Sequence, residues 1–344
     1  MYFYGSKIYL FNWILCTIRF FSIFTEIIKF MYNTIPEILR KMAIENVFST
    51  KTYQNCWKVW QPEILKILGN NYSENEILNL GDHLSEIFRK TGGGGRGQGE
   101  LSASGTAWES LVCWYINLCA IGSRVVAIKK MSIVPKSIQD AITVNYGNFA
   151  CNTESDITII VFPDLPEYNS DVNHFNVLNN QGNIISPFIK TKFNSDLTNF
   201  LAERDFNNYE IGIIQCKTNW NDNAQIPMLW DMIYSSGGFR GRNITIGRNG
   251  FNIQNIQSFS YSFVTVPSNI NTEYKPNAVS VKRVTNLSGG NYWGNPSLQN
   301  VAKSLKEIFT NNFQSGSKTG FRTDLRNALP ELEKGKLLTY FGLH

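Results

Sequence analysis

One stretch decides the fold: residues 209–217, with the sequence Tyr-Glu-Ile-Gly-Ile-Ile-Gln-Cys-Lys, followed by an Asn-rich run. Its apolar, β-branched character, ended by polar residues, is typical of a strand buried on both faces. Because side chains alternate along a strand, Gln215 and Lys217 share one face and Glu210 lies on the other. A lysine at the end of a buried strand is unusual without a partner, so we expect Gln215 and Lys217 to belong to a functional site.

A second stretch of the same kind lies upstream, at residues 154–162, where Asp156 opens an apolar strand. An isolated aspartate there would be a solvated strand-end carboxylate. On a strand next to Gln215 and Lys217, however, it would form a compact site of oxygen ligands suited to Mg²⁺. A lysine beside such an ion can orient or deprotonate a water, or neutralise charge that builds on a phosphate.

The pairs Ser155-Asp156 and Gln215-x-Lys217 resemble the PD-(D/E)XK nuclease superfamily, in the Ser-Asp...Gln-x-Lys form of some type II restriction endonucleases. The resemblance covers residues 100–235. It implies an α/β or α+β fold, with a central mixed β-sheet flanked by helices in a restriction-endonuclease-like core. A helical N-terminal part is predicted separately, because apolar residues recur at helical spacing over residues 44–90. Two features depart from the family pattern: the long gap between Asp156 and Gln215, and an amide where a second carboxylate is usual.

The resemblance also implies roles for individual residues. Asp156 and Gln215 would bind Mg²⁺, the carbonyl of Cys216 would be a further ligand, and Lys217 would position the attacking water. Glu109, on the first core helix, would reach the metal through water. An alternative explains Glu109 without a metal, because Thr106-x-x-Glu109 has the form of a helix capping box. Asp164 is a rival to Asp156, but it follows its strand instead of opening it.

Composition limits the classes of protein that the chain can belong to. A hydrophobic content of 43% over 344 residues excludes global disorder. The net charge of +5 is divided unevenly, since residues 1–41 contribute +3, so any phosphate-binding surface must be a local patch. Six cysteines without a C-x-x-C pair indicate a reduced, cytoplasmic protein. With three histidines in the whole sequence, few ligands for a zinc site are present.

Four parts are predicted along the chain. Residues 1–41 form a hydrophobic extension, 42–99 a helical subdomain with a Gly-rich loop, 100–235 the catalytic core with an insertion at 166–208, and 236–344 a C-terminal β/α part. Within the extension, residues 8–31 are apolar but interrupted by charges. They fit a helix packed on the body, an extension ahead of a start at Met42, or a membrane anchor, and a secretory signal is not indicated.

Several polar residues are candidates for DNA contact. Arg96 lies in the Gly-rich loop, which is either a linker or a loop that closes over DNA. Asn219 and Asn221 could read bases or cap the helix expected at 226–234. The others are cations among glycines or on an expected strand at 279–284: Arg240, Arg242, Arg248, Lys282 and Arg283. Shorter strands are expected at 125–128 and 142–144.

The favoured function is Mg²⁺-dependent cleavage of double-stranded DNA at a specific sequence, as in a type II restriction enzyme. The resemblance implies a cognate DNA methyltransferase as genetic partner. Enzymes that cut both strands of a symmetric site are usually homodimers, although some act as monomers, and the sequence leaves both open. The alternatives are a structure-specific repair or recombination nuclease and a non-catalytic DNA-binding protein.

Overall fold

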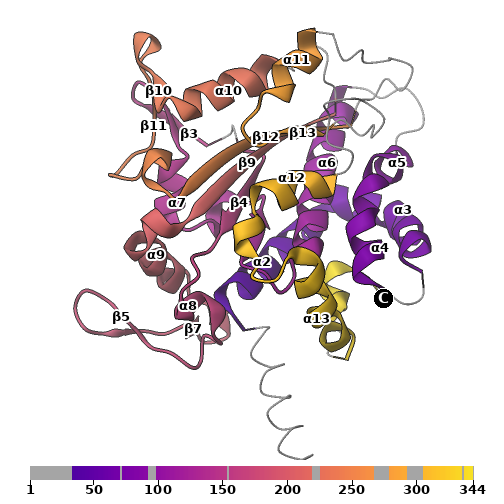
Figure 1. The fold of residues 1–344 in the computed structure, drawn as a ribbon, viewed down its shortest axis with the longest axis horizontal. Coiled ribbons are helices and arrows are strands. Elements are labelled where there is room, and N and C mark those ends of the chain that lie inside the picture. Colours follow the sequence, from indigo (N-terminus) through magenta and orange to yellow (C-terminus); the bar gives the residue numbers. More distant parts are fainter. Residues whose placement is uncertain are drawn as a thin grey trace, which may run out of the picture.

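The computed structural model describes residues 33–69, 72–91, 98–152, 155–218, 225–266, 279–292, 305–334 and 337–343. The fold is mixed α/β, with a central β-sheet between layers of helices (Figure 1). The helices are α2 (Ile35–Phe48), α3 (Lys51–Leu68), α4 (Glu74–Asn79), α5 (Leu84–Arg89), α6 (Gln98–Cys119), α7 (Lys136–Ala141), α8 (Pro166–Asn169), α9 (Ser195–Arg204), α10 (Gln225–Ser235), α11 (Val279–Thr285), α12 (Leu305–Asn312) and α13 (Phe321–Lys334). The strands are β1 (Val125–Ile128), β2 (Val144–Tyr146), β3 (Phe149–Cys151), β4 (Ile157–Val161), β5 (Val177–Leu178), β6 (Ile184–Ile185), β7 (Phe188–Ile189), β8 (Lys192–Phe193), β9 (Glu210–Lys217), β10 (Gly238–Phe239), β11 (Ile244–Ile246), β12 (Ser258–Thr265) and β13 (Asn291–Tyr292).

The central sheet has the order β1-β4-β9-β12-β13 among the described residues. β1, β4 and β9 pair antiparallel, whereas β9, β12 and β13 run parallel, so the sheet is mixed as expected. β9 lies in the middle, and every residue from Glu210 to Cys216 is buried. The continuous apolar pattern of this strand therefore reflects helices on both of its faces.

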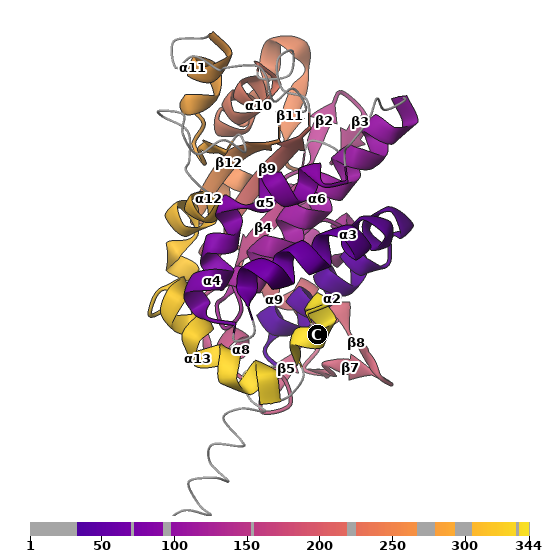
Figure 2. The ribbon, with the colours of Figure 1, turned by 90° about the vertical axis from the view of Figure 1, so that its right-hand side faces the viewer.

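Two hydrophobic cores fill the two faces of the sheet. Ile214 and Cys216 of β9 pack in the core with α3, α5, α6 and α13, whereas Ile211 and Ile213 pack in the other core with residues of α7 and α9. Figures 1 and 2 show α3, α4, α5 and α6 together on one side of the sheet, which confirms the helical N-terminal part. Successive side chains of β9 therefore point alternately into the two hydrophobic cores.

Helix α6 is joined to the sheet by side-chain hydrogen bonds. The indole of Trp108 donates to the carbonyl of Val264 on β12 (3.3 Å). The amide of Asn117 donates to the carbonyl of Ala127 (2.7 Å) and accepts from its N–H (3.0 Å), as a neighbouring strand would. Asn117 therefore satisfies the backbone of edge strand β1 and fixes the position of α6.

The capping-box explanation of Glu109 is wrong. α6 begins at Gln98, so Thr106 lies inside the helix and cannot be its N-cap. The carbonyl of Thr106 accepts from the hydroxyl of Ser110 one turn later (2.8 Å). Glu109 is therefore an interior helical residue that needs another partner.

Two strand predictions also need correction. Residues 279–284 lie in helix α11, which packs on α10, although their β-branched composition favours a strand. Tertiary packing therefore overrides local propensity there. The strand expected at 142–144 begins only at Val144, because helix α7 continues to Ala141 and Ile142 follows as its C-cap.

The insertion at 166–208 forms a lobe of α8, the hairpins β5–β6 and β7–β8, and α9. In the β5–β6 connection the side chain of Asn179 accepts from the N–H groups of Gln181 and Asn183. Helix α9 follows the β7–β8 hairpin and completes the lobe.

The boundary predicted after residue 41 is misplaced, because α2 crosses it. Ile35, Leu39 and Arg40 are almost fully buried, so the end of the expected extension is part of the fold. The Arg40 guanidinium pairs with Glu37 and donates to the carbonyls of Ser123 (3.1 Å) and Val125 (2.6 Å).

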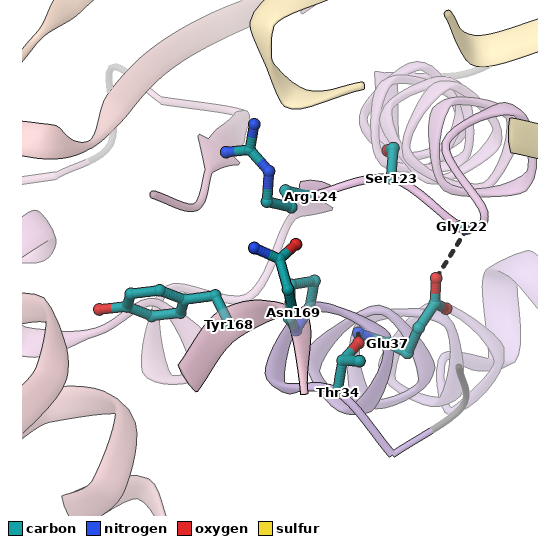
Figure 3. A pocket seen from close by; sticks show the side chains of 8 residues that line it. Thr34, Glu37, Gly122, Ser123, Arg124, Tyr168 and Asn169 are labelled. Atoms are coloured by element: carbon teal, nitrogen blue, oxygen red, sulfur yellow. Dashed lines mark hydrogen bonds between the residues drawn. The ribbon is translucent and has the colours of Figure 1, made fainter. Parts of the chain in front are cut away.

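Figure 3 shows Glu37 directed toward Gly122, whose N–H it accepts at 2.8 Å. The hollow in this view, about 100 Å³ in volume, lies against Arg124, at the opposite end of β1 and β4 from Asp156. The carboxylate of Glu37 beside this hollow therefore holds α2 against the connection between α6 and β1.

The predicted segment 8–31 lies outside the described residues, and so do Arg96 and the Gly-rich loop. Among the helices that the structure does describe, none has the length and apolar character needed to cross a bilayer.

We predict that Arg40→Ala lowers the free energy of unfolding by about 3–5 kcal/mol, because it leaves Glu37 buried without its cation and two carbonyls without a donor. Urea unfolding measures the change. Lys41→Ala is the matched control, since its side chain is 58% exposed, and it should change stability by less than about 0.5 kcal/mol. Equal stability of the two variants would contradict the anchoring role of α2.

Candidate active site

The antiparallel pairing of β4 with β9 brings the predicted site residues together. Ile157 lies opposite Ile214, and continuing this register by one residue places Asp156 opposite Gln215. Asp156 Oδ2 accepts the N–H of Cys216 at 2.7 Å and lies 3.6 Å from Lys217 Nζ. The acid, the amide and the lysine thus meet at one end of the sheet, although the whole lobe at 166–208 separates the acid from the other two in sequence.

Gln215 brings an unsatisfied oxygen to this point. The residue is only 3% exposed, and its Oε1 has no hydrogen-bond partner among the described residues. Buried acceptors are nearly always paired, and an unpaired one costs about 1–3 kcal/mol. A cation bound at this end of the sheet would satisfy that oxygen.

The donor set fits a hard divalent cation. Asp156 supplies a carboxylate, Gln215 an amide oxygen and Cys216 a backbone carbonyl, which are the ligand types that Mg²⁺ accepts. No cluster of three or more His, Cys, Asp or Glu side chains suited to a metal occurs within the described ranges. Any ion at this site would therefore depend on the amide of Gln215 in place of a further carboxylate.

Glu109 reaches the same region from α6, where it meets a lysine that sequence reasoning missed. Lys129 Nζ lies 3.0 Å from Glu109 Oε2 and donates to the Thr106 carbonyl (3.0 Å) and the Ser110 hydroxyl (3.1 Å). Lys129 directly follows the fully buried strand β1. Its position at the end of a buried strand is the signal that singled out Lys217, and it could have identified Lys129 too.

The carboxyl groups of Asp156 and Glu109 influence each other's ionisation. Burial raises the pKa of Asp156, opposed by Lys217, by the Cys216 N–H and by Lys129. Burial also raises the pKa of Glu109; Lys129 lowers it, and the charge of Asp156 raises it further. Two acids and two lysines therefore form one electrostatic unit, in which the ionised acids are held against a desolvation cost.

Thr265 is a second residue that the sequence analysis missed. In the parallel pairing of β9 with β12 it lies opposite Lys217, so the two residues occupy the same face of the sheet. It is fully buried, and its Oγ1 has no hydrogen-bond partner within the described part of the chain. A threonine in a β-strand gives no sequence signal of its own, because β-branched residues are common there.

The other predicted residues are dispersed. Asp164 lies beyond the opposite end of β4, where it pairs with Lys318 (2.9 Å), so it does not belong to the site. Arg248 Nε lies 2.6 Å from Asp140 Oδ1 and thus has a structural partner that was not predicted. The predicted cations Lys282 and Arg283 lie on α11.

Arg240 and Arg242 are exposed on the 3₁₀ turn after β10. Asn219 and Asn221 lie outside the described residues, so the predicted base-reading loop is not placed.

Comparison with protein-family models gives no match to this chain, and comparison with the curated proteins gives none either. The function is therefore inferred from the chemistry and geometry of the site.

We predict that Asp156→Asn raises the melting temperature at neutral pH in metal-free buffer. Because the folded-state pKa of Asp156 is raised, ionisation of this group lowers stability as pH rises through the range above its unfolded pKa of about 3.9. The gain over wild type should grow from acidic to neutral pH in thermal melts. A lower melting temperature for the variant at neutral pH would contradict the assignment.

Asp164→Asn is the matched control with the opposite sign. The hydrogen bond from Lys318 lowers the pKa of Asp164, so its charge stabilises the fold above the unfolded pKa. This group is half exposed, so removing its charge should leave the melting temperature at neutral pH unchanged or slightly lower.

Proposed function

We propose that this protein is a Mg²⁺-dependent endonuclease that hydrolyses phosphodiester bonds in double-stranded DNA at a specific sequence, in the manner of type II restriction enzymes. One observation carries the proposal. Asp156, Lys217 and the buried side-chain oxygen of Gln215, which has no hydrogen-bond partner in the described part of the chain, meet at one end of two adjacent strands in a mixed sheet. That arrangement supports the resemblance of Ser-Asp...Gln-x-Lys to the PD-(D/E)XK nucleases.

The proposed chemistry divides among the residues of the site. Asp156, Gln215 and the Cys216 carbonyl would hold Mg²⁺, and Glu109 would act through water. The bound ion would polarise the phosphate and lower the pKa of a water. Lys217 lies within reach of Asp156 and carries a positive charge into a half-buried position, so it would orient the attacking water and stabilise charge on the phosphate.

Lys129 would act as a positioning residue in this scheme. Its ammonium group contacts Glu109, the Thr106 carbonyl and the Ser110 hydroxyl together, so it holds the glutamate in one orientation on α6. Its charge also opposes the rise that burial causes in the pKa of both acids, which favours their ionised forms.

Sequence-specific cleavage implies protection of the host DNA, so the proposed genetic partner is a cognate DNA methyltransferase. A homodimer would cut both strands of a symmetric site in one complex.

We predict that Lys217→Ala lowers the cleavage rate of supercoiled plasmid in Mg²⁺ by about 10²–10³-fold, because the charge beside Asp156 is lost. Lys58→Ala, at an exposed position of α3, is the matched control and should cleave like the wild type.

The products of the same assay separate the alternatives. Discrete bands from plasmid support restriction, whereas cutting confined to branched or damaged DNA supports a repair or recombination nuclease. Salt-sensitive binding without nicking in Mg²⁺ or Mn²⁺ supports a non-catalytic DNA-binding protein. Unchanged cleavage by Lys217→Ala overturns the proposed site.

We predict opposite effects for two substitutions at Gln215. Gln215→Glu supplies the carboxylate usual in the resembled family and should lower the Mg²⁺ concentration for half-maximal cleavage, whereas Gln215→Ala should raise it, because an oxygen ligand is lost. A Mg²⁺ titration of the cleavage rate measures both. Gln257→Ala, at an exposed position before β12, is the control. Equal Mg²⁺ requirements for all three variants would show that Gln215 is not a ligand.

A further inference from the structure

A second, smaller sheet of the described residues has the order β10-β11-β2-β3. Its strands come from two parts of the chain that flank the catalytic strands in sequence. β3 ends at Cys151, five residues before Asp156, and α10, which leads to β10, begins eight residues after Lys217. Figures 1 and 2 show α10, α11 and the small sheet gathered at one end of the molecule.

The last row of this sheet is apolar on one face. The pairing places Phe239 opposite Ile244, Ile244 opposite Tyr146, and Tyr146 opposite Phe149, so the row crosses all four strands. Directly paired residues project from the same face. We call these four residues the terminal row.

The terminal row continues the apolar face of the small sheet past the point where the hydrophobic core is covered. Two residues further into the sheet, on the same face, Val144 and Ile246 are buried in the core. At the terminal row, Phe149 is 66% exposed, Phe239 51% and Tyr146 37%. The ring of Tyr146 packs edge-on against Trp230 of α10 (6.2 Å), which marks the edge of the covering layer. An exposed apolar patch of this kind usually marks an interaction site, so we expect a bound molecule to cover these three aromatic rings.

Charge around the terminal row indicates the class of that partner. Residues 141–152 and 236–257 contain no acidic residue and three arginines. Arg248 is neutralised by Asp140, whereas Arg240 and Arg242 are exposed on the turn that joins β10 to β11, next to Phe239 and Ile244. The carboxylate of Asp231 on α10 is buried and accepts from Ser288, so it does not offset them. Exposed aromatic rings beside arginines that form no ion pair with the described residues suit a polyanion that carries stacking bases.

We infer that the terminal row is a stacking surface for unstacked bases of DNA held next to the scissile phosphate, with Arg240 and Arg242 on the adjoining phosphates. This inference rests on the proposed action on DNA. The seven Cα–Cα steps from Phe149 to Asp156 span at most about 24 Å, which is the length of about seven base pairs, so one duplex reaches both places. Rings that insert between base steps open or kink the duplex there.

Binding measurements in metal-free buffer test the inference apart from cleavage. The probe is a pool of random-sequence duplexes, and the variants are Phe149→Ala and Phe239→Ala, singly and combined. The double variant should bind roughly tenfold to a hundredfold more weakly with an unchanged salt dependence, because stacking is lost and phosphate contacts remain. Arg240→Ala should instead reduce the slope of affinity against salt concentration by about one.

Two controls separate stacking from general loss of apolar surface. Phe149→Trp should keep or increase affinity, because it keeps an aromatic face. Leu178→Ala removes an equally exposed apolar side chain from the β5–β6 hairpin, at the other end of the molecule, and should bind like the wild type (Figures 1 and 2). Permanganate, which oxidises unstacked thymines, should mark DNA bound by the wild type and not DNA bound by the double variant.

The outcomes distinguish this inference from the proposed function. If the wild type cleaves plasmid and the double variant binds and cleaves equally well, the inference fails and the nuclease stands. If the wild type never nicks DNA but the double variant loses binding and permanganate marking, the inference stands and the nuclease fails. If the double variant loses affinity and also sediments differently from the wild type, the terminal row is an interface between copies of the chain and the inference fails. If the wild type does not bind DNA, both proposals are overturned.

Discussion

The hydrogen bond from the Cys216 N–H to Asp156 Oδ2 is the interaction on which the site depends. It lies where β4 meets β9, and it holds the first carboxylate against the strand that carries Gln215 and Lys217. A shift of one residue in the β4–β9 register would turn Asp156 to the other face of the sheet and separate it from both. The buried apolar residues on both faces of these strands oppose such a shift, so the two hydrophobic cores determine the geometry of a polar site.

The site is formed from the two sides of the sheet. Gln215 and Lys217 belong to the β9 face that packs with α7 and α9, whereas Glu109 comes from α6 on the opposite side. They meet only because the strands end there, and Lys129, at the end of β1, fixes the glutamate. Such an arrangement has a thermodynamic cost: burial disfavours both ionised acids, and the side-chain oxygen of Gln215 has no hydrogen-bond partner among the residues that the structure describes. Buried charges and unpaired polar atoms are characteristic of functional sites, where the residues that carry out a function lower the stability of the fold.

The small sheet shows how the strands that carry the candidate site are connected to the outer surface. β3 leads into β4, and α10 follows β9, so any ligand bound across the terminal row would be positioned by the same two strands that carry the site. The contact between Tyr146 and Trp230 joins these two connections outside the central sheet. Orientation of a substrate and its chemistry would then share one rigid support.

Local pattern within the sequence determined a large part of this protein. Alternation along residues 210–217 was sufficient to place Gln215 and Lys217 on one face, and an acid before an apolar run was sufficient to select Asp156, because both depend only on the two-residue period of a strand. The mixed α/β class and the insertion at 166–208 followed from similarly local signals. Pattern failed where distant packing overrides local preference, as in the β-branched residues 279–284 that form α11, and in the boundary drawn through α2.

Only the tertiary structure decided which groups meet. The register of β4 on β9, the start of α6 upstream of Thr106, and the partners Lys129 of Glu109 and Asp140 of Arg248 depend on contacts between residues far apart in the chain. A single sequence encodes the face on which a side chain lies, because that is set by backbone geometry. Which residue of the neighbouring strand or helix lies next to that side chain is decided by how two layers of helices bury their apolar surfaces against one sheet.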